Sequence, residues 1–415
     1  MSNRRPIRFG VIGCGLMGRE FASAIGRWCH FAQTDVAPVI TTVCDPNEQA
    51  TAWFTDRVPG VTRATTDYKS LLTDDNVDAI YCAVPHNLHA QIYCDIIASG
   101  KHLLGEKPFG IDQAANAKIN AAIAENPKTL VRCSSEIPFY PGAFQLIKWI
   151  QEGRFGKIIE VEAGFWHSSD LDPKKPINWK RMIDVNGEYG CMGDLGMHAM
   201  HVPLRAGWRP KNVRALLSNI VTQRPNASGQ LVPCETWDNA TLACEVETAD
   251  QQFPMVISTK RIAPGHANTW FLNIYGTDFS AKYSTQNPKQ LSYMSYASGS
   301  PQVWQVQDAP HVSAYPVITG GIFEFGFSDS ILQMWAAFCD EVAHGRDGMK
   351  QPFYCATPEE AAETHALFTA ALVSQKEQST VALRCVPSIR EVTTSAIGAD
   401  DHLDHCDPDH SRPRF

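Results

Sequence analysis

Long apolar segments are absent from this sequence: none approaches the roughly 18 uninterrupted apolar residues that cross a membrane. The Arg4-Arg5 pair near the N-terminus is followed by neither a hydrophobic signal region nor a small-residue cleavage site, which an exported precursor requires. We therefore expect a cytoplasmic protein that does not associate with membranes.

Positive charge is also scarce. No run of Lys or Arg exceeds two residues, and 36 Lys and Arg against 44 Asp and Glu give a formal net charge of −8. Nucleic-acid-binding proteins usually carry a basic stripe that neutralises phosphates, and anionic membranes attract basic clusters. We therefore expect neither nucleic acid nor a membrane as a partner.

The 13 cysteines form no CxxC pair and no regular framework. This pattern predicts buried free thiols in a reducing compartment rather than disulfides or a zinc site. His198 and His201 lack a convincing third ligand at suitable spacing, so we predict no bound metal. A further group of metal-ligating residue types lies in what we interpret as a polar tail: His402, His405, Cys406 and His410.

What is present begins with 415 residues, 44% of them hydrophobic, which suffice for two or more domains with sizeable cores. In residues 1–133, short apolar runs alternate with helical patterns, which predicts a parallel sheet with right-handed crossovers. The predicted strands are 7–12, 39–44, 78–84, 102–104 and 129–133, and the predicted helices are 16–28, 50–54, 89–99 and 112–125.

Residues 134–390 have a different pattern. Most of their strand-like runs follow one another without intervening helices, which predicts an antiparallel or mixed sheet and hence an α/β protein overall. These runs are 158–166, 213–220, 239–247, 255–262 and 270–275, with helices expected at 144–152, 330–344 and 361–375. Thr357 and Glu360 form a capping box before the last helix. We interpret residues 285–316 as a long irregular segment and residues 391–415 as the polar tail.

A glycine-rich turn with the GxGxxG pattern joins the first predicted strand to the first predicted helix. Gly13 permits a tight turn, Gly15 lets backbone N–H groups approach a pyrophosphate, and Gly18 lets the helix pack closely against the strand. Leu16 and Met17 lie in the first turn of that helix, whose N-terminus attracts phosphate charge. We predict a dinucleotide site here; the plainer alternative is a glycine-rich turn without a ligand.

Asp45 ends the second predicted strand. A carboxylate at this position accepts hydrogen bonds from the adenosine ribose and repels a 2′-phosphate. No Arg occupies positions 46–48, where it would attract such a phosphate. The cofactor is therefore expected to be NAD(H) rather than NADP(H), unless Asp45 merely starts the next helix.

A proline and three polar residues follow the third strand of the same domain: Pro85, His86, Asn87 and His89. Ligands of parallel sheets bind outside the carboxyl ends of the strands. We therefore expect these four residues to line the cofactor cleft.

A Glu-Lys-Pro motif follows the fourth strand and consists of Glu106, Lys107 and Pro108. A lysine here is able to hydrogen-bond a substrate oxygen and to stabilise negative charge on it, although alone it also fits a surface lysine before proline. Farther along, Asp194 and His198 are spaced to share one face of a helix. A histidine transfers protons near neutral pH, and an aspartate orients it or the substrate. A capped helix with an ordinary histidine explains these two residues equally well.

The order of these motifs resembles that of the Gfo/Idh/MocA family of sugar and cyclitol oxidoreductases over residues 5–390. The resemblance implies a Rossmann domain followed by an α/β domain with a large open, mostly antiparallel sheet that often mediates oligomers. It implies that Lys107, Asp194 and His198 are the catalytic group, with His198 as the proton-transfer residue. It also implies that the glycine motif, Asp45 and the Glu-Lys-Pro turn hold the cofactor.

Two positions depart from the family pattern. His86 directly follows Pro85, where the family often has Asn, and this changes the contact expected beside the nicotinamide. His201 stands three residues past His198, where the family often has an acidic residue, and this changes the local polarity.

Aromatic and polar residues precede the Asp194 segment, at Trp166, His167, Trp179 and Arg181. Trp rings stack on the C–H surfaces of sugars, and basic side chains bind hydroxyl groups. We predict that this loop covers a carbohydrate-like substrate; the alternative is that the aromatic residues belong to the core or to an interface.

Together these features predict an NAD-dependent enzyme that transfers a hydride between nicotinamide and a secondary alcohol or ketone of a sugar, glycoside or inositol. A homo-dimer or homo-tetramer is expected. Two other functions found in relatives stay open. One is redox-neutral cleavage of glycosides with transiently used NAD, and the other is non-catalytic sensing of NAD, which has no need of Lys107, Asp194 and His198 together.

Overall fold

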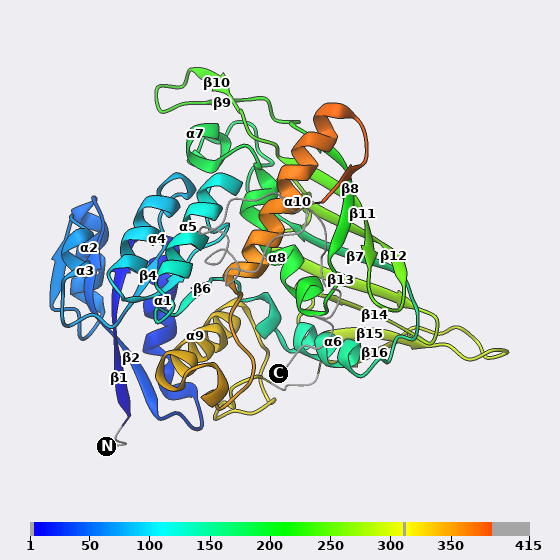
Figure 1. Ribbon diagram of the computed structural model, residues 1–415, viewed down its shortest axis with the longest axis horizontal. Helices are drawn as coiled ribbons and strands as arrows, with labels where there is room; N and C mark the ends of the chain where they lie inside the picture. Colours follow the sequence, from blue (N-terminus) through cyan, green and yellow to red (C-terminus); the bar gives the residue numbers. More distant parts are fainter. Residues whose placement is uncertain (1–3, 310–312, 384–415) are drawn as a thin grey trace, which may run out of the picture.

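The computed structural model describes residues 4–309 and 313–383 of the chain (Figure 1). A parallel sheet is built from the N-terminal third, and a larger, mostly antiparallel sheet is built from the middle of the chain. The predicted α/β class is confirmed. The tail predicted at 391–415, with its His and Cys residues, lies outside the described residues.

Six of the described strands form the parallel sheet, in the order β3-β2-β1-β4-β5-β6. They are β1 (Arg5–Ile12), β2 (Val36–Cys44), β3 (Arg63–Thr65), β4 (Ala79–Cys82), β5 (His102–Gly105) and β6 (Val131–Cys133). The connecting helices are α1 (Leu16–Gly26), α2 (Glu48–Arg57), α3 (Lys69–Leu72), α4 (His89–Ala98) and α5 (Gln113–Glu125). The chain runs outward from β1 to β3 and then returns to β4 on the other side of β1. The carboxyl ends of β1 and β4 therefore flank the crevice in which such sheets bind ligands.

Helix α9 (Phe327–His344) returns from the C-terminal third to pack against α1 and β2. Its Trp335 stacks on Phe21 of α1, with ring centroids 3.6 Å apart, and meets Phe9 of β1 edge-on. The helix itself was predicted, but its buried aromatic side chains complete the core of the first sheet rather than that of the second. The domain boundary at residue 133 stays a prediction. It follows the order of the chain, whereas α9, from the C-terminal third, packs against elements of the N-terminal domain.

Nine further strands of the described chain form the second sheet, in the order β16-β15-β14-β13-β7-β12-β11-β8-β17. They are β7 (Ile158–Trp166), β8 (Pro210–Ser218), β11 (Asn239–Glu247), β12 (Gln252–Lys260), β13 (Thr269–Gly276), β14 (Phe279–Ser284), β15 (Gln290–Ser295), β16 (Gln305–Asp308) and β17 (Val381–Ala382). β7 and β12 pair in parallel, and the other neighbours pair antiparallel. Strands β9 (Gln223–Pro225) and β10 (Leu231–Pro233) form a separate hairpin.

Helices cover one face of this second sheet (Figure 1). They are α6 (Pro141–Gln151), α8 (Cys191–Arg205) and α10 (Pro358–Glu377), and α10 begins with the predicted capping box of Thr357 and Glu360. Along β11, buried residues alternate with exposed ones, as expected for an antiparallel sheet with one solvated face. The shorter helices are α7 (Ile183–Asn186) and the 3-10 turns η1 (Trp28–His30), η2 (His86–Leu88), η3 (Ile137–Phe139), η4 (Trp179–Arg181) and η5 (Arg346–Gly348).

The prediction that residues 285–316 are irregular is wrong over two segments. β15 and β16 extend the large sheet as a hairpin beyond β14. Leu291 is the one fully buried residue of these two strands, and their other residues are half-buried or exposed. Edge strands of this kind lack the apolar run that reveals a strand in a sequence. Within the described ranges, no helix has both the length and the apolar character needed to span a bilayer.

Candidate active site

The glycine-rich turn between β1 and α1 has the geometry of a phosphate cradle. Gly13 has a φ of +95°, and a Cβ on it would lie 2.3 Å from the carbonyl oxygen of Ala83. A Cβ on Gly18 would lie 2.3 Å from the carbonyl oxygen of Gly13. Gly15 caps α1 without a side chain, and apart from its chain neighbours no described atom lies within 4 Å of where its Cβ would be. The space beside the N-terminus of α1 is therefore open at Gly15, which suits the close approach of a pyrophosphate.

Asp45 is fixed beside this turn at the end of β2. One carboxylate oxygen accepts the N–H of Cys14 at 2.8 Å, and the other accepts the N–H of Asn47 at 2.9 Å. Each oxygen keeps a further acceptor position for a ribose hydroxyl. Leu16 is 74% exposed in the first turn of α1, and Met17 is partly buried behind it. The residues present at this crevice therefore fit a dinucleotide.

The four residues after β4 that were predicted to line the cofactor cleft differ in their exposure. Pro85 is partly exposed and Asn87 is exposed, whereas His86 and His89 are buried. His89 bonds the carbonyl oxygen of Val84 at 3.1 Å, and burial lowers its pKa to about 3. His89 therefore holds the loop from inside the core, and we do not retain it as a cofactor contact.

His86 connects this loop to the second domain. Its Nδ1 lies 3.1 Å from the carbonyl oxygen of Asn186, and its ring meets Trp179 edge-on at 4.9 Å. Burial lowers the pKa of His86 well below its ordinary value, so the imidazole is neutral. A neutral ring facing a carbonyl must donate from Nδ1, which leaves Nε2 as an acceptor.

The Glu-Lys-Pro motif follows β5, and Glu106 anchors it. The hydroxyl of Tyr81 donates to Glu106 Oε1 at 2.7 Å, and the hydroxyl of Tyr93 donates to its carbonyl oxygen at 2.9 Å. The carbonyl oxygen of Pro108 pairs with His365 of α10 at 2.7 Å. Both ends of the motif are thereby held, and Lys107 projects toward α8.

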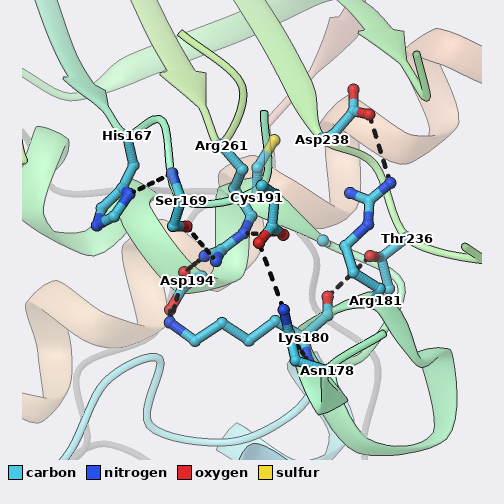
Figure 2. A network of polar contacts seen from close by, with 12 residues as sticks. His167, Ser169, Asn178, Lys180, Arg181, Cys191, Asp194, Thr236, Asp238 and Arg261 are labelled. Carbon is cyan, nitrogen blue, oxygen red and sulfur yellow. Dashed lines mark hydrogen bonds and ion pairs between the residues drawn. The ribbon is translucent and has the colours of Figure 1, made fainter. Parts of the chain in front are cut away.

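Asp194 is the centre of a buried group of charges; Figure 2 shows Lys180 and Arg261 approaching it. Its Oδ1 accepts hydrogen bonds from Lys107 Nζ at 2.9 Å and Lys180 Nζ at 3.0 Å. Its Oδ2 pairs with the guanidinium of Arg261, which also binds Asp170 at 3.0 Å. The side chain of Asp194 is 1% exposed, so the three cations take the place of the water that a carboxylate requires.

This arrangement sets the protonation states of the group. Burial favours neutral Asp194, but Lys107, Lys180 and Arg261 outweigh it and hold the pKa of Asp194 well below its ordinary value. Burial also opposes the charge of Lys107, yet Asp194 and Glu106 raise its pKa. Burial and the positive charges of Arg261 and Lys107 lower the pKa of Lys180 to about 8, although Asp194 acts to raise it. Lys107 and Asp194 are therefore an ion pair at neutral pH.

His198 lies one helical turn after Asp194, in a less charged environment. Its Nδ1 is 3.2 Å from Ser135 Oγ and 3.7 Å from Glu136 Oε2, and its ring stacks on Phe165 with centroids 5.2 Å apart. Burial and the nearby ammonium groups lower the pKa of His198 well below its ordinary value, so it is neutral. Of the two roles expected for Asp194, orientation of the imidazole or of the substrate, the second stays a prediction, because Asp194 binds the cations and Ser135 contacts the imidazole.

Helix α8 positions both residues, because every residue of this helix is buried between the large sheet and α10. Gly196 lies so close to Phe368 of α10 that a Cβ on it would be 2.2 Å from the ring. The adjacent His201 is fully buried and lies 3.3 Å from Glu360 of α10. The side chain of His201, the second departure from the family pattern, therefore points toward α10 rather than toward the charges at Asp194.

Three of the predicted substrate residues are partly exposed near this site. The Nε1–H of Trp166 donates to Ser258 Oγ at 2.9 Å, so its ring is held at the end of β7. His167 accepts the N–H of Ser169 at 2.9 Å, and burial lowers its pKa to about 4. Trp179 packs against His86, as described above, and so lies between the two predicted ligand regions.

Arg181 is the exception among the predicted substrate residues. Its side chain is fully buried, and it donates to Asn219 at 2.7 Å and to Asp238 at 3.3 Å (Figure 2). A guanidinium enclosed in this way supports the loops around it and has no surface for a substrate. We therefore withdraw Arg181 as a substrate contact.

Four residues of the site were not selected from the sequence: Ser135, Glu136, Lys180 and Arg261. Lys180 is adjacent to Arg181 in η4, and only the folded structure shows that the Lys180 side chain points toward Asp194. Arg261 directly follows β12 and lies within the strand predicted at 255–262, so its position near the end of that strand was the available signal.

A protonated lysine and a neutral histidine thus lie close together, both held through α8. Such a pair is able to bind the oxygen of an alcohol or ketone and to move its proton. Among the described residues, no group of three or more His, Cys, Asp or Glu side chains is arranged to hold a metal ion.

Comparison with protein families gives two matches. The family described as "Oxidoreductase family, NAD-binding Rossmann fold" matches residues 7–134, and the family described as "GFO/IDH/MocA C-terminal domain" matches residues 144–282. Together they cover well over half of the chain.

Curated relatives agree with these matches. Levoglucosan dehydrogenase of Pseudarthrobacter phenanthrenivorans is 26% identical over 225 residues, which are 54% of this chain and 57% of the relative. A dTDP-3,4-didehydro-2,6-dideoxy-alpha-D-glucose 3-reductase of Actinomadura kijaniata is 28% identical over 206 residues, 49% of this chain and 56% of the relative. The chain therefore aligns with little more than half the length of each.

Solved structures extend the similarity to the whole fold. Levoglucosan dehydrogenase in complex with NADH and levoglucosan superposes with a TM-score of 0.81 at 21% identity, covering 91% of this chain and 100% of the other. An oxidoreductase domain protein from Kribbella flavida gives a TM-score of 0.82 at 20% identity, covering 92% and 100%.

Proposed function

Because this chain belongs to the Gfo/Idh/MocA oxidoreductase family, whose N-terminal domain is an NAD-binding Rossmann fold, we propose that it is a dehydrogenase or reductase of carbohydrates. The reaction is hydride transfer between NAD(H) and a secondary alcohol or ketone of a sugar, glycoside or inositol. The observation that carries the proposal is the protonated Lys107, held on buried Asp194 one helical turn from the neutral His198.

Bound NAD supplies the hydride acceptor or donor, and the protein supplies position and proton transfer. Gly13, Gly15 and Gly18, with the first turn of α1, hold the pyrophosphate, and Asp45 binds the adenosine ribose. The Glu-Lys-Pro turn follows β5, next to β4 in the sheet, and this position supports a role for Lys107 beside the nicotinamide.

Lys107, positioned by Asp194, holds the reacting oxygen. Lys107 uses two N–H groups on Asp194, one to the carboxylate and one to the carbonyl oxygen at 2.6 Å. An ammonium has three N–H donors, so one stays available for the substrate oxygen. Its charge stabilises the negative charge that develops on that oxygen, and Asp194 keeps the lysine protonated.

His198 moves the proton. As a neutral imidazole it accepts the hydroxyl proton during oxidation, and it returns that proton during reduction. Trp166, His167 and Trp179 cover the substrate from the loop between β7 and α8. A carbohydrate substrate is supported by the names of the relatives, which act on levoglucosan and on a sugar nucleotide.

A homo-dimer or homo-tetramer fits the large sheet. Its uncovered face carries exposed apolar side chains at Ile159 of β7 and Leu216 of β8. A second copy of the chain would remove such surface from water.

The test is a panel of sugars, anhydrosugars, glycosides and inositols with NAD and with NADP, followed by absorbance of the reduced cofactor. We expect one substrate class to reduce NAD, and Lys107→Ala to lower kcat by about 10²–10³. Lys118→Ala, an exposed lysine of α5, is the matched control and should leave the rate unchanged.

Tight NAD binding without reduction on any member of the panel would contradict the proposal. Release of sugar from the glycosides under those conditions would instead identify redox-neutral cleavage, and its absence would favour a sensor.

A further inference from the structure

Asp194 has no capacity left for His198. Its carboxylate pairs with Lys107, Lys180 and Arg261, as shown above. The acidic group nearest to the His198 imidazole is instead Glu136, whose Oε2 lies 3.7 Å from Nδ1. A general base that is itself oriented by a third group is a recurring arrangement in enzymes.

The ring of His198 has a fixed orientation. It stacks on Phe165 with an interplanar angle of 29°, and its Nδ1 edge faces Ser135 Oγ at 3.2 Å and Glu136 beyond it. Glu136 precedes η3, a turn that contacts α8, and its side chain is 5% exposed. An ionised carboxylate only accepts hydrogen bonds, so it favours a proton on Nδ1 and leaves Nε2 free to accept one.

Glu136 and His198 differ in their affinity for a proton. Burial and the ammonium groups of Lys107 and Lys180 disfavour an imidazolium at His198 and lower its pKa well below the ordinary value. Burial raises the pKa of Glu136 to about 7, because charge is costly in this interior as well. A proton that enters the pair is therefore more stable on Glu136 than on His198.

The other titratable groups around Glu136 do not reverse this order. Glu106 raises its pKa further, and Lys107 lowers it. The phenols of Tyr81 and Tyr140 have raised pKa values and are neutral. On the far side of His198, the buried His201 disfavours a cation on the His198 ring.

We propose that Glu136 and His198 act as one proton-accepting pair, with Glu136 as the positioning residue that selects the Nδ1–H tautomer and receives the Nδ1 proton. This inference rests on the proposed oxidation of an alcohol.

The step is balanced. The substrate hydroxyl gives its proton to Nε2, the Nδ1–H bond breaks, and that proton forms an O–H bond on Glu136. The imidazole is neutral before and after, and the carboxylate becomes a carboxylic acid. The hydride leaves the substrate carbon for NAD. The transfer requires Nδ1 and Oε2 to close by roughly 1 Å, which is common when a catalytic site binds its substrate.

The first test needs no substrate. Protein carrying ¹⁵N-histidine, saturated with NADH, is followed by ¹H–¹⁵N correlation spectra between pH 5.5 and 8.5, and the His198 signal is assigned by its loss in His198→Phe. We expect a neutral ring with the proton on Nδ1, and a shift of the His198 signals with a midpoint near pH 7 as Glu136 ionises.

Variants identify the source of that midpoint. Glu136→Gln should abolish it, and Glu136→Asp should move it. Glu152→Gln, which removes an exposed carboxylate on the C-terminal side of α6, should leave it unchanged. A wild-type ring protonated on Nε2, or a midpoint near pH 7 that survives in Glu136→Gln, would overturn the inference.

A kinetic arm uses the substrate that the panel selects. In wild type the oxidation rate should rise as pH passes about 7, because the ionised pair is the base. Glu136→Gln should lose at least about tenfold in kcat and the rise with it, while NADH binding is retained. Failure of the whole panel would count against the proposed function alone, because the spectra test the pair independently.

Discussion

Asp194 and His198 are neighbours on one face of α8, yet their surroundings are opposite in character. Asp194 meets three cations and is held as an anion, whereas His198 meets a phenylalanine ring, a hydroxyl and a raised-pKa carboxyl, and is held neutral. One buried helix therefore supplies both a fixed charge and a proton acceptor. The difference arises from the segments that pack against the helix rather than from the helix itself.

The largest loss of activity is expected from a change at His198, the neutral residue of the two. His198→Phe keeps an aromatic ring against Phe165 but removes the proton acceptor. We expect kcat to fall by about 10²–10⁴, the usual contribution of a general base. The free energy of unfolding should fall by only about 1 kcal/mol, since one neutral hydrogen bond is lost. Steady-state kinetics and urea unfolding measure the two quantities, and retained activity would remove His198 from the proton path.

The charged position should respond in stability as well as in rate. Asp194→Asn leaves Lys107, Lys180 and Arg261 without a carboxylate in a buried site, and breaking such a group costs about 3–5 kcal/mol of unfolding free energy. Exposed Asp75→Asn is the control for loss of one negative charge.

The dependence on pH has a definite sign. Because the folded pKa of Asp194 is lowered, its stabilisation is present above the ordinary aspartate pKa of about 3.9 and is lost only as pH falls toward the folded value. Below pH 8, where Lys180 is charged as well, the loss of unfolding free energy in Asp194→Asn should thus not decrease until pH falls below about 5. A loss below 1 kcal/mol would mean that the cations are satisfied without this carboxylate.

Residues placed by local pattern and residues placed by tertiary contacts also differ in how well the sequence predicted them. The glycine turn and Asp45 lie within one strand–helix–strand unit, so local pattern was sufficient to place them. Lys107, Asp194 and His198 were found through the order of motifs in a family resemblance. Their mutual contacts were not: Asp194 was expected to orient the imidazole or the substrate, and the structure shows it bound to Lys107, Lys180 and Arg261.

Residues that act through tertiary contacts carried no local signal. Lys180 and Arg181 are adjacent in one short turn, and nothing in the local pattern indicates which side chain points toward Asp194 and which toward Asp238. Glu136 follows the last strand of the parallel sheet, and only the packing of η3 against α8 places it beside His198. The polar edge strands β15 and β16 were missed because they have no apolar run.

Transfer of deuterium from a substrate to external NAD tests the central claim most directly. The substrate class selected by the panel is prepared with deuterium on its ring carbons and incubated with excess NAD, and the reduced cofactor is analysed by mass spectrometry. If the enzyme transfers a hydride to free NAD, each NADH formed should carry one deuterium, in equal amount to the ketone produced. Deuterium that stays in or returns to the carbohydrate product, with no net NADH, would contradict it and indicate redox-neutral chemistry at the same site.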